Sequence, residues 1–252
     1  MRTIRTPVVV AVLALAGCGG GGTSLPAHPT VEGPLVKGAN GVWIFRPAGQ
    51  PKRLTIFFHG QGGPVEATPA NHRPWIDHLV ARGSVVIYPR YEISYRAAVM
   101  EPTIAGIRRA SGRVDVDDLP VLALGYSRGA ALAVEYGAVA ESKHLPVPDA
   151  IESVNPVPFG EQAQLVDLSP LRPNTVISVL MSEEDPHALD GARLLMRRLE
   201  TVDFPADQVR LGVARSNKTF VADHLAPLRS SPSARAAYWT PTDKLLAEIG
   251  SD

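Results

Sequence analysis

Residues 122–131 read Leu-Ala-Leu-Gly-Tyr-Ser-Arg-Gly-Ala-Ala. An apolar run ends here in the pattern Gly-x-Ser-x-Gly and small residues follow at once, which predicts a buried strand, a sharp turn and a helix. Such a turn forces its serine into a strained backbone conformation and presents the hydroxyl to solvent. Gly125 and Gly129 let the strand and the helix pass closely because neither carries a Cβ atom. Ser127 is therefore the candidate nucleophile.

Strands and helices are expected to alternate on both sides of this turn. An early antiparallel hairpin is expected at residues 36–45, with its turn at residues 38–41. Apolar and β-branched runs predict further strands at residues 54–58, 84–88, 122–126, 151–154, 175–181 and 209–213. Helical patterns are found at residues 75–81, 97–110, 128–139, 188–199 and 234–249. This alternation predicts an α/β fold with a mostly parallel sheet and helices on both faces.

The composition excludes some classes of function. The chain has 252 residues, enough for one large core, and we expect a single folded domain that is a monomer. Its 25 Lys and Arg residues balance 25 Asp and Glu residues, so no overall field attracts nucleic acid. Outside the N-terminus, no apolar run approaches the roughly 20 residues of a membrane-spanning helix.

The N-terminus has the pattern of a targeting segment. Arg2 and Arg5 precede an apolar run at residues 7–16, which is too short to span a membrane. Residues 15–18, Leu-Ala-Gly-Cys, resemble the lipobox of bacterial lipoprotein signal peptides, whose cysteine becomes the lipidated first residue of the mature chain. Cys18 is the only cysteine in the sequence, so it has no disulfide partner within the chain.

This resemblance implies an organisation in three parts. We expect a signal peptide at residues 1–17, a lipidated Cys18 with a flexible tether through residue 30, and a folded domain at residues 31–252. The lipid would hold the domain at a membrane of the bacterial cell envelope, on the non-cytoplasmic side.

The order of motifs along the chain resembles the α/β-hydrolase family over roughly residues 31–249. That family carries a nucleophile elbow after its fifth strand, an oxyanion loop after its third, an acid after its seventh and a histidine after its eighth. The loop His-Gly-Gln-Gly-Gly at residues 59–63, the Gly-x-Ser-Arg-Gly turn and the compact size resemble the small esterase, dienelactone-hydrolase and chlorophyllase-like branches. The resemblance implies an α/β-hydrolase fold and an activity that needs no cofactor.

The resemblance also implies partners for Ser127. His224 lies in the loop after the last predicted strand, where the family places the base that takes the serine proton. The preceding strand runs into Ser-Glu-Glu-Asp-Pro at residues 182–186, where three carboxylates compete for the third role. Asp185 fits best because the family's aspartate commonly stands a few residues past this strand, just before a helix. Glu184 is the alternative.

The negative oxygen that forms during attack needs backbone N–H donors. The Arg128 amide directly follows the nucleophile, at the start of a helix whose dipole favours negative charge. The second donor is expected in the loop after His59, from Gln61 or alternatively from Gly62. No His-Glu-x-x-His pattern occurs in the sequence, so we expect no metal site.

Together these residues favour a secreted, lipid-anchored serine hydrolase. It would cleave carboxylic esters of small molecules or lipids through an acyl-enzyme formed on Ser127. The alternative is a catalytically inactive envelope lipoprotein that keeps the same fold for a binding role, because a fold alone does not establish an activity.

Overall fold

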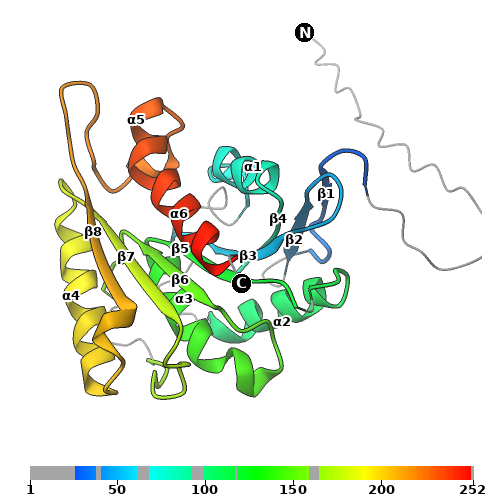
Figure 1. The fold of residues 1–252 in the computed structure, drawn as a ribbon, viewed down its shortest axis with the longest axis horizontal. Coiled ribbons are helices and arrows are strands. Elements are labelled where there is room, and N and C mark those ends of the chain that lie inside the picture. Colours follow the sequence, from blue (N-terminus) through cyan, green and yellow to red (C-terminus); the bar gives the residue numbers. More distant parts are fainter. Residues whose placement is uncertain are drawn as a thin grey trace, which may run out of the picture.

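The computed structural model describes residues 26–37, 41–61, 68–91, 99–116, 118–158 and 165–250. The expected signal peptide, Cys18, most of the tether and Gly62 lie outside these ranges. Within the described ranges, eight strands form one sheet in the order β1-β2-β4-β3-β5-β6-β7-β8 (Figure 1). From β1 to β8 their bounds are Thr30–Glu32, Val42–Arg46, Arg53–Phe58, Ser84–Pro89, Val121–Tyr126, Ala150–Val154, Val176–Ser182 and Val209–Ala214.

The sheet is antiparallel only at its β1 end. β1 runs antiparallel to β2 and β2 to β4, whereas every later pair, from β4–β3 to β7–β8, is parallel. The register places Phe58 of β3 opposite Gly125 of β5, and Tyr126 of β5 opposite Val154 of β6. Because the carboxyl ends of parallel strands meet at one edge of a sheet, the loops after β3, β5, β6, β7 and β8 gather there.

Helices cover both faces of the sheet. The bounds in the described ranges are Arg73–Ala81 for α1, Met100–Ser111 for α2, Arg128–Ala140 for α3, Pro186–Thr201 for α4, Pro232–Ala234 for α5 and Thr240–Ile249 for α6. Side chains alternate along β3: Ile56 and Phe58 belong to the core under α2, α3 and α4, whereas Phe57 packs edge-on against Trp75 of α1. α1 and α6 lie on the same face (Figure 1). A mostly parallel sheet between two helical layers confirms the expected fold class.

The predicted hairpin at residues 36–45 is wrong in its first strand. β2 lies within that range, but its partner β1 comes earlier in the chain, with Val31 opposite Phe45. Pro34 has no amide hydrogen to donate to β2, and beyond Glu32 the contact continues as a hydrogen bond from the Leu35 amide to the Val42 carbonyl oxygen at 2.9 Å. Residues 38–40, most of the predicted turn, lie outside the described ranges.

The C-terminal helix is also less regular than its sequence pattern predicts. α6 begins at Thr240, and a π-helical turn over Arg235–Trp239 joins it to α5. Pro241 stands in the first turn of α6 and has no amide hydrogen to donate to a carbonyl four residues earlier. The regular hydrogen-bond ladder is therefore interrupted where the π turn occurs.

Candidate active site

Ser127 occupies the sharp turn between β5 and α3. Its backbone has φ 57° and ψ −121°, a conformation that residues with a Cβ atom rarely adopt. A Cβ on Gly125 would lie 2.1 Å from the Gly129 carbonyl oxygen, and a Cβ on Gly129 would lie 2.2 Å from the Phe58 carbonyl oxygen. Both glycines are therefore required by close backbone approach, as the motif predicts.

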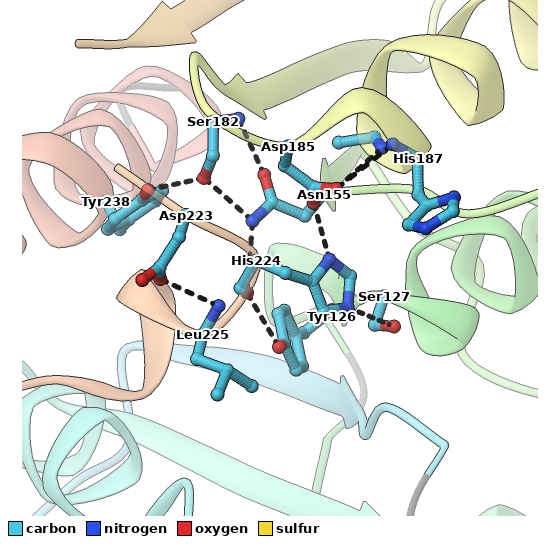
Figure 2. A network of polar contacts seen from close by, with 11 residues as sticks. Tyr126, Ser127, Asn155, Ser182, Asp185, His187, Asp223, His224, Leu225 and Tyr238 are labelled. Carbon is cyan, nitrogen blue, oxygen red and sulfur yellow. Dashed lines mark hydrogen bonds and ion pairs between the residues drawn. The ribbon is translucent and has the colours of Figure 1, made fainter. Parts of the chain in front are cut away.

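Three predicted site residues form a continuous chain of polar contacts at the carboxyl edge of the sheet (Figure 2). Ser127 Oγ lies 2.9 Å from His224 Nε2, and His224 Nδ1 lies 2.5 Å from Asp185 Oδ2. A proton on Nδ1 is donated to the carboxylate, which leaves Nε2 free to accept the serine proton. The residues come from three different loops, after β5, β7 and β8.

Asp185 is held in place by the helix that follows it. Its Oδ1 accepts hydrogen bonds from the amides of His187 and Ala188 at 3.1 and 3.2 Å and so caps α4, while Oδ2 is directed at His224. Asp185 is only 3% exposed, whereas Glu184 is exposed to solvent. Of the two carboxylates that the sequence left open, the structure brings Asp185 to the histidine.

The loop after β3 also approaches Ser127. A Cβ on Gly60 would lie 3.2 Å from the Ser127 Cβ, so this glycine lies directly against the elbow. Gln61 follows, and its Oε1 accepts a hydrogen bond from Arg128 Nη1 at 3.3 Å. Arg128 itself is the first residue of α3 and is buried. The structure thus brings Gln61 and Arg128 together beside Ser127.

Comparison with known proteins rests on structure alone. No protein-family model matches the chain, and no curated protein matches its sequence. Esterase B from Lactobacillus rhamnosis matches with a TM-score of 0.66 at 14% identity, over 90% of this chain and 88% of that one. An esterase from the fungus Rhizomucor miehei gives a TM-score of 0.62 at 19% identity, over 90% of this chain and 86% of that one.

A third solved structure, an α/β hydrolase enzyme from a Medee basin deep-sea metagenome library, gives a TM-score of 0.63 at 13% identity. It covers 90% of this chain and 100% of its own. The chain has the α/β-hydrolase fold. Its strand order is consistent with that fold. The elbow follows β5, and Asp185 and His224 follow β7 and β8, at the edge of the sheet where the fold brings these loops together.

Two histidines of this α/β-hydrolase fold are buried near the site. Burial lowers the pKa of His59 to about 4 and that of His72 to about 3, so both rings are neutral at pH 7. The His59 ring stacks on Tyr91, with ring centroids 3.8 Å apart, and the Tyr91 hydroxyl donates to the His59 carbonyl. His59 therefore packs the base of the loop that carries Gln61.

Sequence reasoning missed two residues that contact the backbone of His224. The Tyr126 hydroxyl and the Asn155 side-chain amide both donate to the His224 carbonyl oxygen (Figure 2). Tyr126 stands at a variable position of the motif, so the motif does not indicate its role. Asn155 directly follows β6 at the carboxyl edge of the sheet, and this position alone could have indicated that it lies near the site.

In the described part of the chain, no group of three or more His, Cys, Asp or Glu side chains is arranged to hold a metal ion. Ser127, His224 and Asp185 together can carry out proton transfer and nucleophilic attack.

Proposed function

We propose that this protein is a serine hydrolase that cleaves carboxylic esters through a Ser127, His224 and Asp185 triad. The proposal rests on one observation, the unbroken contact from Ser127 Oγ through the imidazole to the buried carboxylate at a strained elbow. A serine hydroxyl is a weak nucleophile unless an adjacent base takes its proton, and this geometry supplies that base.

The reaction follows from the positions of these atoms. His224 Nε2 takes the proton of Ser127 as Oγ attacks the ester carbonyl carbon, and the imidazolium then gives that proton to the departing alcohol. Water, deprotonated by the same nitrogen, then attacks the acyl carbon, the bond to Ser127 Oγ breaks, and the imidazolium returns its proton to Oγ as the acid leaves. Asp185 stabilises the imidazolium and fixes the tautomer with the proton on Nδ1.

The tetrahedral oxyanion is stabilised by the amides of Arg128 and Gln61 in this proposal. Arg128 begins α3, where the helix dipole adds favourable potential, and Gln61 contacts the Arg128 side chain. The names of the three solved structures reported above support a hydrolase activity: two are esterases and one is an α/β hydrolase enzyme.

We also propose that Cys18 carries a lipid and tethers the enzyme to the non-cytoplasmic side of a bacterial membrane. The support is the Leu-Ala-Gly-Cys sequence and the single cysteine. Among the helices that the structure describes, none is both long and apolar enough to cross a bilayer. The first described strand, β1, begins at Thr30, the last residue of the proposed tether.

A series of p-nitrophenyl esters from acetate to long acyl chains tests the proposed activity. The wild-type protein should hydrolyse at least one member, and Ser127→Ala should lower kcat by ~10⁴-fold or more. The chain length with the highest kcat/KM identifies the acyl group. Absence of hydrolysis across the series would favour a binding role for the fold instead, and equal rates in Ser127→Ala would mean that another residue is the nucleophile.

A further inference from the structure

We propose that Asn155 and Tyr126 are positioning residues that hold His224, the base of the triad, in place. We also propose that Asn155 connects the loop that carries His224 to the turn that carries Asp185. This inference rests on the proposed serine hydrolase function for its effect on turnover. The contacts that carry it are independent of that function.

The His224 carbonyl oxygen accepts two hydrogen bonds from side chains (Figure 2). The Tyr126 hydroxyl donates to it at 2.8 Å, and Asn155 Nδ2 donates to it at 3.3 Å. A carbonyl oxygen has two lone pairs, so both acceptor sites of this peptide group are used. The backbone of the catalytic histidine is thereby attached to the strands β5 and β6.

Asn155 makes a second attachment, to the turn that carries the acid. Its Oδ1 accepts from the Ser182 amide at 2.8 Å, and its Nδ2 also donates to Ser182 Oγ at 2.8 Å. Ser182 ends β7, three positions before Asp185, and its hydroxyl contacts the Tyr238 hydroxyl at 2.6 Å. One buried amide therefore links the loop of His224 to the turn of Asp185.

Phe220 and Ala222 anchor this loop in the core, and the Glu184 amide donates to the Ala222 carbonyl oxygen at 2.9 Å, but the packing is looser at the histidine itself. The His224 side chain is 33% exposed, and the neighbouring Leu225 is 57% exposed. The buried neighbours Ala222 and Ala226 contribute small side chains. A displacement of about 1 Å in a catalytic group costs ~100-fold in rate, so backbone hydrogen bonds at His224 have a direct effect on catalysis.

Asn155 also has the backbone conformation that suits an asparagine. Its φ is 47°, in the left-handed region where asparagine is enriched and glycine is unstrained. Asn155→Gly therefore removes the amide without forcing the backbone out of place, whereas alanine would add strain of its own.

Tyr126→Phe, with Tyr136→Phe as its matched control, gives the first test. Both remove a tyrosine hydroxyl that donates to a backbone carbonyl, but the Tyr136 partner is Pro146, in the loop that precedes β6. Tyr126→Phe should lower kcat about tenfold with KM unchanged, whereas the control should keep the wild-type kcat. Equal kcat values in the two variants would overturn the role of Tyr126.

Asn155→Gly gives the second test, and here kcat should fall ~100-fold with KM near the wild-type value. A readout that needs no turnover is the proton resonance of His224 Nδ1, which the 2.5 Å contact to Asp185 should place downfield and protect from exchange. In folded Asn155→Gly this resonance should broaden or disappear.

These readouts separate the positioning role from the proposed activity. If the wild type hydrolyses no ester but the resonance is lost in Asn155→Gly, the positioning role stands and the proposed function fails. A folded Asn155→Gly with wild-type kcat and a wild-type resonance would overturn the inference. If Asn155→Gly does not fold, the resonance and kcat of Tyr126→Phe decide the question against its control.

Discussion

A buried carboxyl group in the centre of the sheet makes a quantitative prediction about stability. Glu152 is fully buried in β6, on the face that α6 covers and between the apolar residues Ala150 and Val154 of the same face. Burial raises the pKa of the Glu152 carboxyl from its ordinary value of 4.5 to about 8, and the charge of Asp243 adds to this, while Thr242 partly opposes it. The group is therefore protonated in the folded protein at neutral pH.

The sign of the pH dependence follows from this pKa. Between pH 4.5 and about 8, the folded protein keeps a proton that the unfolded chain has released, so the free energy of unfolding falls as pH rises. Each pH unit in this interval corresponds to about 1.4 kcal/mol. From pH 4.5 to about 8 the loss is ~5 kcal/mol, as large as the whole stability of many domains. Above about 8 the carboxyl is ionised in both states and the loss stops.

Glu152→Gln replaces the neutral acid by a neutral amide of the same shape and removes this titration. Urea unfolding at pH values from 4 to 9 should show similar stabilities near pH 4 and a difference that grows to ~5 kcal/mol in favour of the variant near pH 8. Glu200→Gln, the same change on the exposed face of α4, should follow the wild-type curve. Parallel curves for wild type and Glu152→Gln would refute the reasoning.

Three further predictions concern the site and the chain around it. Asp185→Asn should fold normally and lose ~10⁴-fold in kcat, while Glu184→Gln stays near wild type; ester hydrolysis by both variants checks this. Gly129→Ala forces a Cβ to within 2.2 Å of a backbone oxygen and should lower the free energy of unfolding by about 3 kcal/mol in urea, whereas Gly112→Ala, with no contact under 3.6 Å, should not. Cys18→Ser should abolish lipidation without changing kcat, which mass spectrometry of the mature N-terminus and an ester assay would show.

The features that sequence predicted well are local ones. The elbow is encoded within a few residues, because only glycine permits the 2.1 and 2.2 Å approaches found at Gly125 and Gly129. The alternation of apolar runs with helical patterns likewise predicts parallel strands between helices, and the parallel sheet gathers the loops of Ser127, Asp185 and His224 at one edge.

The features that sequence could not predict depend on contacts between distant segments. The family resemblance favoured Asp185 over the adjacent Glu184, but the physical reason, the start of α4 and the approach of the His224 loop, is visible only in the structure. Asn155 and His224 are 69 residues apart, so no local pattern indicates that their side chain and carbonyl meet. Glu152 is an acidic residue in a predicted strand, and its burial is caused by the packing of α6 across β6.

Covalent labelling of the nucleophile tests the central claim most directly. The wild-type protein is incubated with a fluorophosphonate, its intact mass is measured, and the modified peptide is sequenced by mass spectrometry, with Ser127→Ala treated in parallel. The account predicts the addition of one phosphonyl group, located on Ser127, and an unmodified Ser127→Ala protein, since His224 Nε2 is the base in contact with that hydroxyl. An unlabelled wild type, or labelling that persists in Ser127→Ala, would contradict it.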